Sequence, residues 1–181
     1  LKEKYQKEVV PQMQKVFGYK NTMAVPKILK VVINTCFGKT AVTKTSGERE
    51  KMQNLIMQDL ASISGQKPKL VKSKKSIAGF KLREGLEIAA MVTLRKSKMW
   101  DFLERLVYLS FPRSRDFKGL DQKTIDKKGN LNIGFREHIS FPEIFAEKEK
   151  TIFGLEITVV TNAKNKEEGL ELYKLLGFPM K

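Results

Sequence analysis

Few residues of this chain could carry out bond-making chemistry. Gly38-Lys39-Thr40 matches the end of a phosphate-binding loop, but that motif needs another glycine five positions earlier, where Ile33 stands. His138 is the single histidine, and no motif supplies a partner that would orient it as a base. Its position on the polar side of an alternating run indicates a surface side chain. The sequence therefore predicts neither a nucleotide loop nor a catalytic base.

The sequence also has few residues that could bind a metal or carry out redox chemistry. Because Cys36 is the single cysteine, no internal disulfide and no cysteine-based metal cluster can form, and one histidine cannot complete a Cys/His zinc site. At the end of a β-rich run, Cys36 is expected to be a small, half-buried residue and not a reactive thiol. The acidic residues are scattered, with no paired carboxylates. We expect no enzyme activity, no cofactor and no metal.

The net charge is the first strong indication of a partner. The 181 residues include 35 Lys and Arg against 20 Asp and Glu, which gives a formal net charge of +15 at pH 7. Such an excess repels itself in a compact protein unless an anion lies nearby. Nucleic acid is the usual partner, because each phosphate contact releases condensed counterions. Charge alone leaves a soluble protein with a basic surface as the alternative.

Three clusters concentrate this charge. The densest cluster runs from Lys67 to Arg83 and has no acidic residue before Glu84, which follows it. Its seven cations are Lys67, Lys69, Lys72, Lys74, Lys75, Lys81 and Arg83. Ser76 and Phe80 lie among them, and serine can hydrogen-bond a phosphate backbone while phenylalanine can stack on a base. The other clusters are Arg95-Lys96-Ser97-Lys98 and the group Arg113, Arg115 and Lys118. Together they indicate an extended contact with a polyanion.

Hydrophobic periodicity predicts a single domain, residues 1–181, of the α+β class. Helical spacing predicts helices over 2–17, 50–64, 98–110 and 166–176. Alternation predicts strands over 28–36, 86–94, 131–141 and 154–161, with a short extended piece after Pro68. We expect a largely antiparallel sheet with helices packed on one face, which leaves the other face free for a ligand such as RNA.

The segments between these elements carry further expectations. Residues 39–50 are expected to form a polar segment, and residues 72–84 a long basic loop that protrudes. Pro112 is expected to end the third helix. Glu168, three residues after Asn165, predicts a helix N-terminal cap. Within 131–141, the outward residues are expected to be Asn132, Arg136, His138 and Ser140.

Several strings, in order and over nearly the whole chain, resemble the large-subunit ribosomal protein five (uL5) family in its bacterial form. They are Ile63-Ser64-Gly65-Gln66-Lys67-Pro68, Lys74-Lys75-Ser76-Ile77-Ala78-Gly79-Phe80-Lys81-Leu82-Arg83, Val92-Thr93-Leu94-Arg95, Met99-Trp100, Pro112-Arg113, Arg115-Asp116-Phe117-Lys118-Gly119-Leu120, Gly129-Asn130-Leu131-Asn132, Phe141-Pro142-Glu143-Ile144 and Gly177-Phe178-Pro179. The resemblance implies a structural protein of the large ribosomal subunit that binds 5S rRNA and helps attach it to the central protuberance.

The resemblance also implies particular 5S rRNA contacts. Asn34 follows the family's Val-Val-Ile, Gln66 lies in Gly-Gln-Lys-Pro and Thr93 in Val-Thr-Leu-Arg, and each matches a 5S-binding position. The cations beside them that would serve the same RNA are Lys67, Lys69 and Arg95. Asn, Gln and Thr are also ordinary turn and edge residues, so this assignment depends on the resemblance.

Two further surfaces follow from the resemblance alone. The basic loop resembles the family loop that reaches the P-site tRNA elbow, and its candidate contacts are Lys72, Lys74, Lys75, Ser76, Phe80, Lys81 and Arg83. A second region resembles the surface that meets a small-subunit head protein in an intersubunit bridge, with Arg113, Arg115, Lys118 and Arg136. The implied partners also include 23S-type rRNA and other 5S rRNA-binding ribosomal proteins.

The sequence departs from the family pattern at two places. Cys36 stands where the family usually has glycine, two residues after Asn34, and a side chain there alters the local approach to RNA. The segment between Gly38 and Gln53 is roughly half a dozen residues longer than usual, an insertion that a surface loop tolerates.

Two other classes of function remain open at this point. One is an RNA-modifying or nucleotide-using enzyme acting on rRNA or tRNA, and the other is a regulatory module that bridges to a protein through residues 113–130. No apolar run is long enough to span a bilayer, and residues 1–4 show no signal-peptide core. We expect a cytoplasmic, ribosome-bound protein, with an organellar ribosome as the alternative.

Overall fold

A computed structural model describes residues 1–115, 117–144 and 151–181. Its contacts divide the chain into two compact units. Unit 1 holds Leu1–Val32, Leu94–Ile133 and Ile157–Lys181, and unit 2 holds Ile33–Thr93 and Gly134–Glu156. The chain returns to each unit after leaving it, so residues far apart in the sequence build both cores. Among the described residues, no helix has the length and apolar character needed to cross a membrane.

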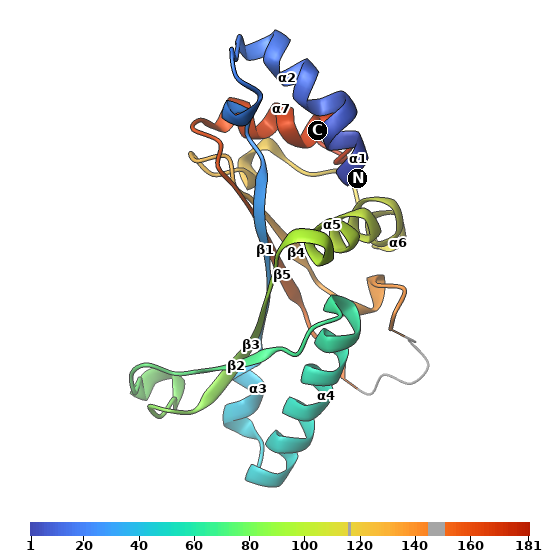
Figure 1. The fold of residues 1–181 in the computed structure, drawn as a ribbon. Helices are drawn as coiled ribbons and strands as arrows, with labels where there is room; N and C mark the ends of the chain where they lie inside the picture. Colours follow the sequence, from blue (N-terminus) through green and yellow to red (C-terminus); the bar gives the residue numbers. More distant parts are fainter. Residues whose placement is uncertain (116, 145–150) are drawn as a thin grey trace. The chain divides into compact units, whose positions relative to one another are not determined.

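A five-stranded antiparallel sheet confirms the expected α+β class. Its strands, in the order β2-β3-β1-β5-β4 (Figure 1), are β1 Ile28–Cys36, β2 Lys69–Lys72, β3 Glu87–Leu94, β4 Leu131–Phe135 and β5 Leu155–Thr161. The predicted strand 28–36 is confirmed, the short piece after Pro68 is β2, and the predicted strands 86–94 and 154–161 each begin one residue later.

Buried and less buried side chains alternate along β4 and β5 and along most of β1 and β3, whereas the short β2 buries none. In β1 the buried residues include Val31, Ile33 and Thr35, and in β3 Ala90, Val92 and Leu94. The residues between them are half-buried, because they point to the face of the sheet opposite the core. The strands therefore keep a second face that the core does not use.

Unit 1 contains the helices of both chain ends. The predicted N-terminal helix comprises α1 Lys2–Lys4, a π-helical turn Tyr5–Val9 and α2 Val10–Phe17, and it ends at Gly18. The predicted C-terminal helix is α7 Lys166–Leu176, which ends at Gly177 with φ +91°. Its expected cap is present in part: Glu168 accepts the N–H of Lys164 at 2.9 Å, while Asn165 makes no side-chain cap.

Pro112 does not end the third helix. The chain is helical through α5 Lys96–Arg105, a π-helical turn Leu106–Ser110 and α6 Phe111–Arg113. Pro112 lies inside this continuous helix, where it has no N–H to donate to a carbonyl of the preceding turn and its ring would crowd a regular α-helical turn. The wider π-type turn before it accommodates the proline ring, which the sequence pattern did not show.

Unit 2 contains two helices where a polar segment was expected. Residues 39–50 are mostly helical: they lie in α3, Gly38–Thr43, and at the start of α4, Ser46–Ser64. A capping box starts α4: the Thr45 hydroxyl donates to Glu48 Oε2 at 2.8 Å, and the Thr45 N–H donates to the same oxygen at 3.1 Å. The Thr45 hydroxyl, and then its backbone N–H, hold the pKa of Glu48 below its usual value.

The predicted strand 131–141 ends at Phe135, and the alternation expected beyond it is wrong. The chain forms a 3-10 turn over His138–Ser140, so His138 is buried at 0% exposure instead of facing outward. Its ring stacks on Phe153 at 3.9 Å between centroids, and its Nδ1 accepts the Phe153 N–H at 3.4 Å. Its Nε2 lies 3.7 Å from Asp59 Oδ2. His138 is thus part of the core of unit 2.

Cys36 also differs from expectation. The side chain is exposed and not half-buried, because Cys36 continues the outward-facing side of β1 beyond the buried Thr35. Phe37 leaves the strand as a buried residue, and its N–H donates to the Ile88 carbonyl at 2.9 Å.

Candidate nucleic-acid interface

Two of the three expected 5S-binding side chains lie in direct contact. Gln66 follows the end of α4, and its Nε2 donates to the carbonyl oxygen of Thr93 in β3 at 3.3 Å. Ser64 shapes the turn between them, since its hydroxyl oxygen accepts the Gln66 N–H at 3.3 Å and lies 2.6 Å from the Leu60 carbonyl. Gly65 permits the turn with φ +64°. The Gln66 residue is exposed at the surface.

Asn34 and Thr93 occupy the sheet face that the core does not use. Asn34 is half-buried between the buried Ile33 and Thr35 of β1, and Thr93 is half-buried between the buried Val92 and Leu94 of β3. β1 and β3 are neighbours in the sheet. Alternation therefore directs both polar side chains to one face.

Lysine and apolar side chains complete this part of the face. Lys69 is the register partner of Met91, and partners across an antiparallel pair share a face. Val71, paired with Ala89, lies on that face too. Lys69 is exposed, whereas Met91 and Val71 are half-buried. We call Asn34, Gln66, Lys69, Met91 and Thr93 the sheet-face cluster.

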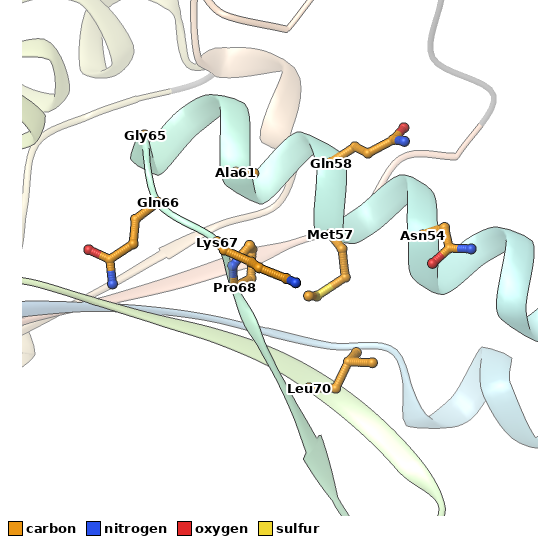
Figure 2. A pocket seen from close by; sticks show the side chains of 9 residues that line it. All are labelled: Asn54, Met57, Gln58, Ala61, Gly65, Gln66, Lys67, Pro68 and Leu70. Carbon is orange, nitrogen blue, oxygen red and sulfur yellow. The ribbon is translucent and has the colours of Figure 1, made fainter.

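An open groove of about 590 Å³ lies between α4 and β2, beside this cluster. Figure 2 shows Met57 of α4 and Leu70 of β2 pointing toward one another, with the Lys67 side chain extending toward Met57. Asn54, Met57, Gln58 and Ala61 of α4 line it at spacings that share one helix face. The sequence pattern alone predicted no groove here, although the spacing of these α4 residues is visible in it.

The basic loop is an ordered extension of the hairpin formed by β2 and β3. Ile77 and Leu82 exchange backbone hydrogen bonds at 3.0 and 3.1 Å around a 3-10 turn, Ala78–Phe80. Ser76 accepts the Glu84 N–H at 2.9 Å, so its hydroxyl also holds the loop together. Phe80, near the turn, is 69% exposed. The loop displays this ring among exposed cations: Lys72, Lys74, Lys75, Lys81 and Arg83.

One of these cations has an acidic partner. Lys72 Nζ lies 4.0 Å from Glu87 Oε1, and the two residues are register partners at the base of the hairpin. The lysine side chain is 65% exposed, so the pairing is weak and leaves the ammonium available to an anion.

The remaining expected site residues are all exposed or half-buried at the surface. Arg95 is the N-terminal cap residue of α5 in unit 1. Arg113, Arg115 and Lys118 are also in unit 1, while Arg136 belongs to unit 2. Asp116, within the same string, lies outside the described residues.

The potential metal ligands of the described residues do not cluster. No group of three or more His, Cys, Asp or Glu side chains among them could hold a metal ion. The buried position of His138 inside unit 2 removes it from any surface site. The fold and this surface together define a basic α+β protein that displays polar and cationic side chains on an open sheet face.

Comparisons with known proteins identify the family. Residues 21–83 match the family model described as Ribosomal protein L5, and residues 87–180 match the model described as the C-terminus of the same ribosomal family. The large ribosomal subunit protein uL5 of Halothermothrix orenii is 48% identical over 179 residues, covering 99% of this chain and 97% of that protein. The uL5 protein of Geotalea daltonii is 49% identical over 181 residues, covering 100% of this chain and 98% of that protein. Protein uL5c of Gracilaria tenuistipitata is 48% identical over 179 residues, covering 99% of this chain and 97% of that protein.

The chain belongs to the uL5 family of ribosomal proteins. It is a structural, non-enzymatic component of the large ribosomal subunit that binds rRNA. The prediction that it is not an enzyme is thereby confirmed, and the alternative of an RNA-modifying or nucleotide-using enzyme is set aside.

Proposed function

We propose that this protein binds 5S rRNA through the sheet-face cluster and so attaches it to the central protuberance of the large subunit. The hydrogen bond from Gln66 to the Thr93 carbonyl carries the proposal, because it joins a turn and a strand into one polar surface. Asn34 presents a carboxamide on the same face. Lys67 and Lys69, with Arg95, supply charge for phosphates.

The chemistry of the cluster suits RNA. Carboxamide and hydroxyl groups can donate to and accept from base edges and the 2′-hydroxyl, which distinguishes RNA from DNA. Half-buried Met91 and Val71 offer apolar surface against which a sugar or base can pack. The remainder of the large-subunit contact, with 23S-type rRNA and other 5S rRNA-binding proteins, is part of the same proposal.

The test is equilibrium binding of the full chain to a 5S rRNA transcript at fixed salt. Asn34→Ala, Gln66→Ala and Thr93→Ala should each weaken binding roughly 5- to 150-fold, the loss expected for about 1–3 kcal/mol of base or sugar recognition. Gln12→Ala and Thr40→Ala serve as controls, because both change exposed residues in other helices. Unchanged affinity of all three cluster variants, with folding intact, would contradict the assignment.

We propose further that the basic loop contacts P-site tRNA. Its exposed Phe80 ring and its cations combine a stacking surface with phosphate attraction. Ribosomes carrying Phe80→Ala should bind tRNA less tightly in the P site, whereas Ile77→Ala, which removes another exposed apolar side chain of the loop, should change binding less. Equal losses would assign the effect to the shape of the loop instead of to stacking.

A third part of the proposal is a bridge to a small-subunit head protein through Arg113, Arg115, Lys118 and Arg136. Replacing these four cations by Gln should reduce the fraction of subunits that sediment as joined ribosomes. Binding to 5S rRNA should remain, which separates the bridge from the sheet-face cluster. If 5S binding falls equally, the four cations act on rRNA and not across the subunit interface. The alternative of a regulatory module that bridges to another protein through residues 113–130 gives a parallel expectation: loss of that segment should spare 5S binding and weaken subunit joining.

A further inference from the structure

The groove between α4 and β2 has chemistry that the sheet-face cluster does not explain. Met57 and Leu70 face one another across it, and the buried Pro68 lies at the base of the same turn. Its volume of about 590 Å³ falls within the roughly 300–1,000 Å³ range of small-ligand sites. The groove is therefore large enough for a planar ring and not only for solvent.

We infer that this groove binds one unstacked nucleotide of the rRNA that the sheet-face cluster contacts. The inference rests on the proposed function and adds a second, pocket-like site to it. In this arrangement the base packs between Met57 and Leu70, whose apolar side chains tolerate any base. Sequence-dependent RNA recognition depends on bases splayed out of the helix in this way.

Carboxamides around the groove supply hydrogen bonds for a base edge. Asn54 and Gln58 both line it and are four residues apart on α4, so they lie on one side of the helix. Each carboxamide holds a donor and an acceptor side by side, a combination that pairs with an adenine edge in two hydrogen bonds. The groove thus fits a purine better than a featureless apolar ring.

Charge favours a nucleotide over a protein side chain. Among the described residues that line the groove, Lys67 is charged and none is acidic. Figure 2 shows its ammonium group directed into the groove near Met57, where a nucleotide phosphate can be reached. Gln66 lines the groove and also bonds Thr93, so the two surfaces share a residue. An RNA strand held at the cluster can therefore deliver a neighbouring nucleotide to the groove.

Filling the groove provides the test. Ala61 is half-buried and lines the groove, so Ala61→Leu places a larger side chain inside it without weakening the helix. Ser62→Leu is the matched control, since Ser62 is the next residue of α4, is exposed and does not line the groove. Full-length variants would be titrated with a 5S rRNA transcript, and base reactivity toward chemical probes would be mapped in each complex.

The expected result is a roughly tenfold loss of affinity for Ala61→Leu and restored reactivity of a base that the original protein protects. Ser62→Leu should keep both affinity and protection. If Ala61→Leu binds and protects like the original protein while Gln66→Ala is weakened, the groove inference is wrong and the proposed function stands. If the unaltered protein does not bind 5S rRNA, both fall.

A second pair of substitutions guards against misfolding of the filled variant. Asn54→Ala with Gln58→Ala changes only exposed side chains of α4 and should lift protection from the same base. Wild-type protection in this double variant would overturn the role of the carboxamides. A filled groove that leaves RNA protection unchanged but blocks joining of another ribosomal protein would show a protein occupant and overturn the inference.

Discussion

Two glycines bring a turn of unit 1 against helix α7. Gly129 has φ +73°, and a Cβ added to it would lie 2.7 Å from Ala163 Cβ. A Cβ on Gly169 would lie 2.6 Å from Gly129 Cα, so the two backbones are in direct contact. The buried Tyr173 hydroxyl bonds the Gly129 and Val159 carbonyls, at 3.1 and 3.2 Å. At the scale of single residues, the absence of side chains at Gly129 and Gly169 allows the turn to pack directly on α7.

Gly169→Ala should therefore destabilise the protein, against the ordinary preference for alanine inside a helix. We expect a loss of roughly 2–3 kcal/mol in the free energy of unfolding, because neighbouring backbone cannot move aside cheaply. Urea unfolding monitored by circular dichroism measures it. Gly47→Ala is the control: it is also in a helix, and its added Cβ would meet nothing within 4 Å. That variant should be stabilised by about 0.5–1 kcal/mol, and equal destabilisation of both variants would contradict the packing argument.

At the scale of elements, two segments expected to be loops are ordered by local hydrogen bonds. The basic loop continues the β2–β3 hairpin, so its cations are presented by a defined backbone and not by a mobile strand of charge. The segment 39–50 becomes α3 and the start of α4, because Thr45 and Glu48 cap the helix reciprocally. These residues thus add helix to unit 2.

Thr45→Ala should lower the thermal midpoint at pH 7 by roughly 2–4 °C, because the start of α4 loses its side-chain cap. The pKa of Glu48 is below its usual value of 4.5 in the folded protein, so its contribution is present above that pH and is lost as the pH falls through the folded value. The difference between the two proteins should therefore shrink on acidification below about pH 4.5. Thermal melts from pH 7 to pH 3 provide the measurement, with Thr43→Ala as a control. A pH-independent difference would exclude Glu48 from the cap.

At the scale of the whole molecule, a net charge of +15 makes RNA affinity strongly dependent on salt. The contribution of the neutral side chains of the sheet-face cluster should then be separable from that of the lysines. Lys67→Gln and Lys69→Gln should each reduce the slope of log affinity against log salt by about 0.7–0.9, as expected for one lost phosphate contact. Asn34→Ala should lower affinity with the slope unchanged. Binding isotherms from low to high salt measure both, and a slope change for Asn34→Ala would contradict its role as a neutral contact.

Much of the fold could be predicted because it depends on short-range pattern. Strand β1 and helix α7 were predicted with their observed bounds, since alternation and helical spacing are visible in the sequence. In the structure the same alternation places Asn34 and Thr93 on the face opposite the core. The sequence motifs shared with the family indicated a ribosomal protein. Charge and periodicity alone indicated only that the protein binds a polyanion.

The sequence by itself determined the charge, the strand faces and the family of this protein. Only the tertiary structure decided which distant residues meet. The Gln66–Thr93 bond joins positions 27 residues apart, and the stacking of His138 on Phe153 depends on where β4 ends. The groove likewise needs α4 and β2 side by side. Such contacts depend on how elements pack, and packing is a property of the folded core that local periodicity does not encode.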